Sequence, residues 1–296
     1  MLYLLYLLLL GCVCVIGLSV YYNVTLKCEY YEIIDSKLPD EFDGCKIILL
    51  SDLHENQYGE HNSKLLEKIE KESPDYIMIA GDMLVKSDHF HADKTLLLLK
   101  GLVKKYPVIY TPGNHEEYLE RRVETCLEYA QFVERIKKMG VIYLANETIS
   151  LKREKATLQV AGLHLQKEYF AKFYEDVRFD HSNVAELIGK KQEEYTILLA
   201  HTPVYFEEYA KWGANLVCSG HVHGGIVILP FLGGVISTTY ELFPKYDHGQ
   251  FQIDNTKMVL SRGLGMHTIK LRLFNKPEIS VIQLKKKKKE SFNKQE

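Results

Sequence analysis

The chain has 296 residues, of which 46% are hydrophobic and 26% are charged, and its formal net charge is −2 with histidine neutral. This is the composition of an ordinary folded protein, and the length suffices for one large domain or two small ones. Basic residues are scattered until the end of the chain. The charge therefore excludes a protein that binds nucleic acid through a global positive field, and we expect no nucleic-acid partner.

Residues 1–22 contain no charged side chain. A run of this length can cross the roughly 30 Å hydrocarbon core of a bilayer as a helix. A cleaved signal peptide is disfavoured because the run has no basic start and no clear small-residue cleavage site. Residues 9–12, Leu-Leu-Gly-Cys, faintly resemble a lipoprotein cleavage box. We predict a retained single-pass membrane anchor, with cleavage and lipidation as the alternatives.

The side of the membrane on which the following domain lies stays open. Lys27 and Lys37 follow the span, and no lysine or arginine precedes it. The positive-inside rule then favours a cytoplasmic domain, but this bias depends on two residues.

After the span, apolar runs alternate with amphipathic segments. Residues 46–50, KIILL, form a continuous apolar run that is too short for a helix and is typical of a buried parallel strand. The same reasoning predicts strands over 28–34, 75–80, 107–110 and 141–144, and helices over 63–71, 92–105 and 118–139. In the second half it predicts a hairpin over 148–151 and 157–163, a short helix over 204–211, and strands over 195–200, 215–218, 226–229, 249–253, 258–261 and 279–284.

Strand–helix–strand alternation indicates an α/β fold with a mainly parallel sheet in the first half. The strand-rich second half suits a second sheet. We therefore predict a four-layer αββα sandwich of two facing mixed sheets. The domain boundaries expected are an anchor over 1–22, one domain over 23–284 and a lysine-rich tail over 285–296.

Polar side chains stand where five of the predicted strands end. They are Asp52 and His54, Asp82, Asn114, His201, and the pair His221 and His223. Each group alone is an ordinary turn or helix cap. Together they matter, because ligands of an open α/β sheet bind outside the carboxyl ends of its strands. We expect all of these side chains to converge on one crevice.

These residue types suit a pair of metal ions. Asp52 and His54 lie at i and i+2, on one face of an extended chain, so one ion can take both. Asp82 can bridge two ions, and Asn114 offers a neutral oxygen. A mixture of imidazole and carboxylate ligands favours zinc, manganese or iron over calcium or magnesium. The sequence does not distinguish among these three metals.

The ordered motifs Asp-x-His, Gly-Asp, Gly-Asn-His-Glu, His and Gly-His-x-His resemble those of the calcineurin-like metallophosphoesterase superfamily. The resemblance extends from about residue 46 to residue 284, and these motifs are highly specific as an ordered set. The pattern over 261–265, 271–272 and 277–279, together with the preceding span, resembles one branch of it. That branch holds bacterial membrane-linked phosphoesterases related to the UDP-diacylglucosamine hydrolases of the lipid A pathway.

The resemblance implies a role for each position. The first metal would be held by Asp52, His54 and His223. The second would be held by Asn114, His201 and His221, with Asp82 bridging the two. His115 would lie over the phosphate, stabilising the transition state or protonating the leaving oxygen. Glu116 stands where the family usually has Asp, and would orient His115 through a longer arm. Ile226 stands where the branch often has Gln, so substrate selection is less defined than the metal pair.

Other features have two interpretations each. The lysine run 285–289 is either a solvated tail or a segment attracted to anionic lipid headgroups. Arg262 and Arg272 either form structural salt bridges or grip a substrate phosphate. His164 has no ligand-like context, but it follows a strand-like run, so lining the crevice is its less favoured interpretation. Segment 166–179, rich in Tyr and Phe, either packs as a satellite core or covers the crevice.

The function predicted is a membrane-anchored, dinuclear metal-dependent phosphoesterase. Its bond would be a phosphodiester or a pyrophosphate, in a small molecule or in a lipid or nucleotide-linked precursor. A phosphomonoesterase of broad specificity is the nearest alternative. A metal-binding interaction module without activity is the other, and it is disfavoured because every motif residue is present. Oligomeric state and physiological substrate stay open.

Overall fold

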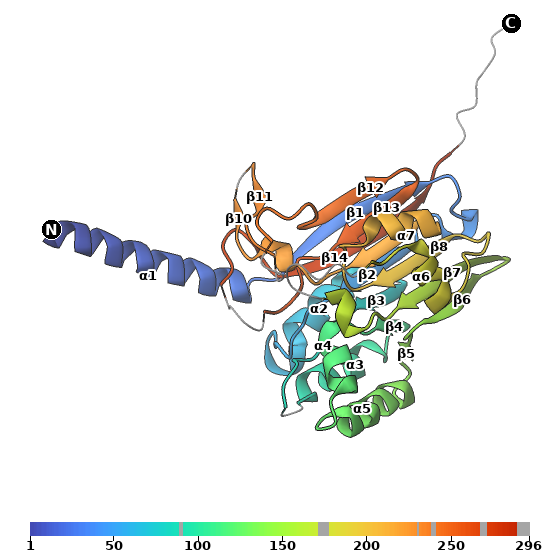
Figure 1. The fold of residues 1–296 in the computed structure, drawn as a ribbon, viewed down its shortest axis with the longest axis horizontal. Helices are drawn as coiled ribbons and strands as arrows, with labels where there is room; N and C mark the ends of the chain where they lie inside the picture. The colour runs from blue at the N-terminus through green and yellow to red at the C-terminus, as the bar shows by residue number, and fades with distance from the viewer. Residues whose placement is uncertain (89–90, 171–177, 230, 238–240, 267–270, 289–296) are drawn as a thin grey trace, which may run out of the picture.

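Two six-stranded sheets face each other in the computed structural model, which describes residues 1–88, 91–170, 178–229, 231–237, 241–266 and 271–288 (Figure 1). The first sheet has the order β1 (Lys27–Asp35), β14 (Glu278–Lys286), β2 (Lys46–Leu50), β3 (Tyr76–Ala80), β4 (Val108–Thr111) and β5 (Ile142–Tyr143). Strands β2 to β5 are parallel, and β14 runs antiparallel to β2.

The second sheet has the order β12 (Gly249–Ile253), β13 (Thr256–Leu260), β9 (Leu216–Ser219), β8 (Thr196–Ala200), β7 (Ala156–Leu163) and β6 (Glu147–Arg153). Strands β13, β9, β8 and β7 are parallel, and the edge strands β12 and β6 are antiparallel to their neighbours. Both sheets are therefore mixed, as predicted.

Side chains alternate along the buried strands between two cores. Ile47 and Leu49 of β2 lie in the core between the sheets, with Ile197 of β8. Ile48 lies in the core on the outer face of the first sheet. That outer core includes α2 (Ser63–Glu72), α3 (Asp93–Leu102) and α5 (Cys126–Lys138), while α6 (His181–Ile188) and α7 (Phe206–Trp212) pack on the second sheet. The four-layer αββα prediction is confirmed.

One predicted helix is wrong. The single helix expected over 118–139 is two helices, α4 (Asn114–Arg121) and α5, separated by a turn. Arg122 leaves the helical region with ψ 131°. The Thr125 hydroxyl donates a hydrogen bond to the Leu119 carbonyl over 2.8 Å and so satisfies an orphan acceptor at the end of α4. The apolar periodicity continues across the turn, and for that reason it suggested one helix.

Two further differences concern short elements. Helix α6 was not predicted. The strand expected over 226–229 pairs only as β10 (Ile228–Leu229) with β11 (Gly233–Gly234), in a small hairpin outside both sheets. This hairpin projects from the body beside the base of the N-terminal helix (Figure 1).

The N-terminal helix α1, Leu2–Val24, extends away from the two sheets (Figure 1). By length and composition, Tyr3–Val24 can cross a membrane. The base of the helix is fixed to the segment before β14. There Ser19 Oγ accepts a hydrogen bond from the Arg272 amide over 3.2 Å, and the ring centroids of Tyr22 and Phe274 lie 5.9 Å apart.

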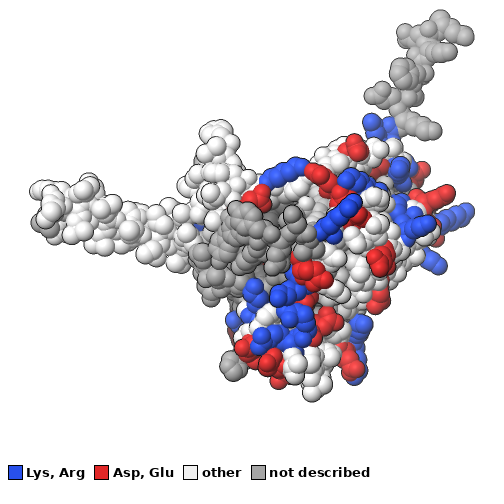
Figure 2. Space-filling view, in the orientation of Figure 1, with Lys and Arg blue, Asp and Glu red and all other residues white. Residues whose placement is uncertain are grey.

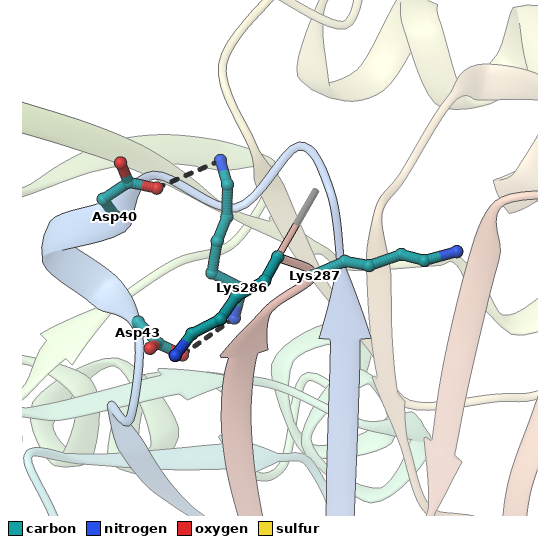
Figure 3. Close-up of a pocket in the computed structure, with 5 residues that line it drawn as sticks. Asp40, Asp43, Lys286 and Lys287 are labelled. Carbon is teal, nitrogen blue, oxygen red and sulfur yellow. Dashed lines mark hydrogen bonds and ion pairs between the residues drawn. The ribbon is translucent and has the colours of Figure 1, made fainter. Parts of the chain in front are cut away.

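The lysine run begins at the opposite end of the same strand pair. β1 starts at Lys27 and pairs in register with β14 up to Asp35 and Lys286. Eight residue steps of about 3.3 Å place Lys286 about 26 Å from the start of β1. Lys286 Nζ lies 3.3 Å from Asp40 Oδ1, and its amide donates to Asp43 (Figure 3). Because charge effects fall off within about 8 Å at physiological salt, the position favours a locally paired, solvated run over attraction to headgroups near α1.

Candidate metal centre

The ends of five strands meet at one edge of the two sheets. Strands β2, β3 and β4 are parallel in the first sheet, and β8 and β9 are parallel in the second. Their carboxyl ends carry the side chains that the sequence singled out, all of which are buried except the half-buried Asn114. Three sets of ligand atoms converge there, namely Asp52, His54 and His223; His54, Asp82 and His115; and Asp82, His201 and His221.

The first group consists of Asp52, His54 and His223. The Nε2 atoms of the two imidazoles lie 3.1 Å apart. His223 Nε2 is 3.4 Å from Asp52 Oδ1, and His54 Nε2 is 3.9 Å from the same oxygen. Two nitrogens and one carboxylate oxygen thus face one small volume.

The second group consists of Asn114, His201 and His221. His201 Nε2 lies 3.1 Å from Asn114 Oδ1 and 3.2 Å from His221 Nδ1. Asp82 belongs to both groups. Its Oδ2 is 3.2 Å from His201 Nε2 and 3.9 Å from His54 Nε2. A single carboxylate oxygen therefore stands between the two sets of nitrogens.

Hydrogen bonds to the main chain fix the tautomer of three of these imidazoles. Nδ1 lies 3.3 Å from the Leu84 carbonyl in His54, 2.7 Å from the Ala80 carbonyl in His201, and 2.9 Å from the Gly265 carbonyl in His223. A carbonyl oxygen only accepts, so each Nδ1 carries the proton and each Nε2 presents a lone pair. Outer hydrogen bonds of this kind orient metal-ligating histidines.

The donor set fits divalent cations. The lone pairs of His54 and His223 point at each other over 3.1 Å, and Asp52 and Asp82 add negative charge beside them. Such an arrangement is repulsive unless a cation or a proton lies between the donors. Imidazole nitrogens and carboxylate oxygens are the ligands of transition-metal ions such as zinc, manganese and iron.

The electrostatics indicate that protons compete for this position. Burial raises the pKa of Asp52 to about 7 and lowers that of His221 to about 3. Burial also acts to lower the pKa of His201, but the neighbouring Asp82 and Asp52 outweigh it and raise the value to about 10. A proton held on His201 would therefore have to leave when a cation binds.

His115 has the opposite tautomer from these three imidazoles. Its Nδ1 lies 3.0 Å from the Lys86 amide nitrogen, which donates to it. In the neutral ring the proton is therefore on Nε2, which lies 3.7 Å from Asp82 Oδ2. His115 thus directs a donor, rather than a lone pair, at the place where the two groups meet.

Glu116 does not occupy the position expected from the sequence. Its carboxylate accepts hydrogen bonds from the amides of Asp82, Leu84 and Gly113 and from the Tyr110 hydroxyl, at 2.7–3.1 Å. These four donors fill the lone-pair positions of a carboxylate. The carboxylate therefore does not orient the His115 ring directly, as the sequence suggested. Glu116 fixes the backbone of the loops that carry Asp82 and Asn114.

The backbone at the site is strained. Asp52, Asp82 and His223 have φ values of 52°, 55° and 51°. Non-glycine residues in this region cost about 1 kcal/mol or more each and cluster at functional sites. Close packing adds to the constraint, because a Cβ at Gly113 or Gly220 would collide with the carboxylate of Asp82 or Asp52 respectively. These glycines let the backbone approach the ligand atoms.

A buried segment that the sequence did not assign to the site holds the first group. The fully buried Arg272 donates to the carbonyls of Arg262, Gly263 and Gly265. Gly265 in turn accepts from His223. Asn275 Nδ2 donates to the His223 carbonyl over 2.7 Å. The motif over 261–265 was a signal for this segment, but the role of Arg272 depends on tertiary contacts.

The structure places the other residues that the sequence singled out, namely Arg262, Arg272 and His164. Arg262 pairs with Glu29 and Glu278, which confirms the structural interpretation, and Arg272 serves the main chain rather than a phosphate. His164 Nε2 lies 2.8 Å from Glu120 Oε2, on the side of α4.

In segment 166–179, Tyr169 packs on Phe179 and Tyr205, which fits the satellite core. The Phe170 ring of the same segment lies 5.6 Å from that of His221, which fits the alternative that the segment covers the crevice. Residues 171–177 lie outside the described part of the chain.

Fold and site together define a metal-dependent α/β hydrolase with its ligands at the strand ends. The family model for the calcineurin-like phosphoesterase matches residues 45–225, and the chain belongs to this family of metallophosphoesterases. It is 28% identical to the metallophosphoesterase YkuE of Bacillus subtilis, over 86% of this chain and 84% of that one. It is 23% identical to the UDP-2,3-diacylglucosamine pyrophosphatase LpxG of Chlamydia muridarum, over 84% of this chain and 87% of that one.

A transmembrane protein with a metallophosphoesterase domain from Danio rerio is 25% identical to this chain. The alignment covers 86% of this chain and 56% of the Danio rerio protein.

Proposed function

We propose that this protein is a membrane-anchored phosphoesterase with two divalent ions that hydrolyses a phosphodiester or pyrophosphate bond. The observation that carries the proposal is the contrast among the histidines. Three of them are locked with Nε2 lone pairs facing inward, and His115 is locked with an Nε2 proton facing the same place. The first kind holds cations, and the second delivers a proton.

The ligand sets follow from the geometry of the two groups. Asp52, His54 and His223 would hold one ion, and Asn114, His201 and His221 the other. Asp82 would contact both, since its Oδ2 faces nitrogens of each group. Two such ions polarise phosphoryl oxygens and supply a nucleophile from water at neutral pH. The ligand types suit zinc, manganese or iron.

The chain's own contribution to bond cleavage is assigned to His115. The Lys86 amide holds Nδ1 as an acceptor, so the ring can give the Nε2 proton to the leaving oxygen and recover it from solvent. Protonation of the leaving group matters most for alkoxide leaving groups, which are poor in water. Glu116 acts indirectly, because it fixes the loops beneath Asp82 and His115.

A diester or pyrophosphate substrate is favoured by two considerations. The relative LpxG is a pyrophosphatase of a diacylated sugar nucleotide by its name. Helix α1 would keep this enzyme beside lipid-linked substrates. A broad phosphomonoesterase is the second candidate. A non-catalytic binding module has no support from the site, because both groups and His115 are complete.

The test uses the full chain in detergent, loaded with manganese, zinc or iron in turn. Bis-p-nitrophenyl phosphate, p-nitrophenyl phosphate and a diphosphate diester are compared at one pH, with His115→Ala as the control. Diester or diphosphate cleavage that is lost in the variant supports the proposal. Faster cleavage of the monoester would select the phosphomonoesterase. If the metal-loaded protein cleaves none of the esters, the proposal is contradicted.

A further inference from the structure

Large apolar side chains are exposed in a cluster next to the base of α1. We call the apolar rim the residues Phe231, Leu232, Leu242, Phe243 and Phe274. Phe231 is fully exposed, at 107% of its reference area, and the other four are 54–65% exposed. A contiguous exposed patch of this kind on a folded domain usually marks an interaction surface.

The rim is joined directly to the metal centre. The chain passes from His223 through Gly225 into the hairpin β10–β11, which carries Phe231 and Leu232. Val227 forms a bridge with Leu273, the residue before Phe274. Asn275, the residue after Phe274, donates to the carbonyl of His223. Few residues therefore separate the rim from the first group of ligands.

The rim is also continuous with the membrane helix. The Phe274 ring lies 5.9 Å from that of Tyr22 in α1. Lys276 Nζ lies 5.1 Å from the centre of the Tyr21 ring and 5.9 Å from that of Tyr22. Tyrosines flanked by lysine at the end of an apolar helix are typical of the membrane–water interface. The rim thus lies at the level where α1 would leave the bilayer.

Charged residues are sparse along the segment that carries most of the rim. Glu241 is the single charged residue in the sequence from 226 to 243. Figure 2 shows uncharged surface over α1 and over the projecting hairpin, whereas lysine, arginine, aspartate and glutamate gather over the rest of the body. This division matches a molecule with one face toward lipid and the other toward water.

We infer that the apolar rim inserts into the interface of the same bilayer that α1 enters. Continuity with the helix through Tyr22 and Phe274 selects this occupant over a second copy of the chain. Insertion would hold the loop that follows His223, and with it the first group of ligands, close to the headgroup layer. Resting on the proposed function, the inference also names the substrate class, which is a phosphoester of a lipid whose acyl chains stay in the membrane during hydrolysis.

The insertion itself is tested without reference to activity. The full chain is reconstituted in phosphatidylcholine–phosphatidylglycerol nanodiscs, and Phe231→Trp is introduced in a Trp212→Phe background. Val123→Trp in the same background is the matched control, because Val123 is 88% exposed on the turn between α4 and α5. Brominated acyl chains should quench the Phe231→Trp emission at least about twofold and leave the control unchanged, since quenching requires contact with the acyl region.

Equal quenching in the two variants would overturn the inference. So would a dimer in nanodiscs that the double variant Phe231→Ser/Leu232→Ser dissociates, because the rim would then be covered by a second copy. Circular dichroism and metal content confirm that each variant is folded.

The substrate class is tested with two esters that share a leaving group. Phosphatidyl-p-nitrophenol in the nanodisc is compared with soluble bis-p-nitrophenyl phosphate. The double variant Phe231→Ser/Leu232→Ser should lose about tenfold on the lipid ester, the scale of two interfacial apolar side chains, and stay within about twofold on the soluble one. An equal change on both esters would overturn the substrate class. Failure of the wild type on both would count against the proposed function, while the quenching result would stand.

Discussion

The two groups of the metal centre are built on different supports. His201 in the second group donates to the carbonyl of Ala80, the last residue of β3 in the buried sheet. His223 in the first group donates to Gly265, in a segment held by Arg272 and Asn275. The Arg272 amide in turn donates to Ser19 of α1.

The two groups therefore differ in how far their geometry depends on contacts outside the sheets. The second group is placed by strand ends, by the Ala80 carbonyl and by the loops that Glu116 fixes. The first group depends in addition on a segment that contacts α1. A change where this segment contacts α1 should therefore loosen the first group and leave the second intact.

The largest effect is expected where the two groups meet. Asp82→Asn keeps the size of the side chain and its bond from the His115 amide but removes the charge that both groups share. We expect turnover to fall about 1000-fold, equivalent to roughly 4 kcal/mol of transition-state stabilisation. The measurement is diester hydrolysis together with metal content. A variant with full metal and near-normal turnover would remove the basis for a shared carboxylate.

His115→Gln separates the holding of ions from the delivery of a proton. Because His115 belongs to neither group of ligands in our assignment, metal content should stay the same. Turnover should fall about 100-fold or more, the scale of general acid catalysis. The loss should be smaller for p-nitrophenolate, a good leaving group, than for an alkyl alcohol. Loss of bound metal in this variant would instead make His115 a ligand.

Asn275→Ala tests the dependence of the first group on its segment. The change leaves the carbonyls of His223 and Ile226 without their donor. Affinity for one of two ions should fall about 10- to 100-fold, and affinity for the other should hold.

Asn215→Ala is the matched control, because Asn215 is also buried and bonds to main chain, but within the second sheet. Both variants lose a buried amide, and only Asn275→Ala should change metal affinity. Equal loss at both ions would show that the two groups are not supported separately.

The smallest expected effect is on the pH dependence of stability and concerns Glu278, whose amide donates to Gly263 in the segment that holds the first group. Burial raises the pKa of Glu278 above its ordinary value of 4.5, although Arg262, Ser280 and Tyr31 favour the ionised form and Glu29 opposes it. The folded protein then binds more protons than the unfolded chain from pH 4.5 up to the raised pKa. The free energy of unfolding consequently falls as pH rises through this window.

Glu278→Gln should remove the contribution of Glu278 to that slope and so make it shallower. Thermal midpoints of the full chain in detergent, measured from pH 4.5 to 7, give the comparison. Parallel curves for the variant and the wild type would show that Glu278 is ionised throughout.

The sheets were predictable because buried parallel strands are continuous apolar runs. The predicted bounds of β2, residues 46–50, agree with the structure, and the five strand ends converge as expected. The apolar periodicity wrongly predicted one helix over α4 and α5. The periodicity continues through the turn between them, where the Thr125 hydroxyl bonds to the end of α4.

Outer contacts of the site could not be read from the sequence. Glu116 was expected to orient its neighbour, but it reaches main-chain amides 32 and 34 residues earlier in the chain. Arg272 and Asn275 act on residues brought near by folding, and they carry no local pattern that announces a role. The candidate ligands follow from side-chain type and strand position, which the sequence does display, whereas their division between two ions came from the resemblance to the family.

The number of ions bound per chain tests the account most directly. The full chain is stripped with a chelator, reloaded with manganese, and measured by elemental analysis beside diester turnover, for the wild type and Asp82→Asn. The account predicts two ions per chain in the active wild type, and weakened binding with lost turnover in the variant. An active wild type that binds one ion or none would contradict it.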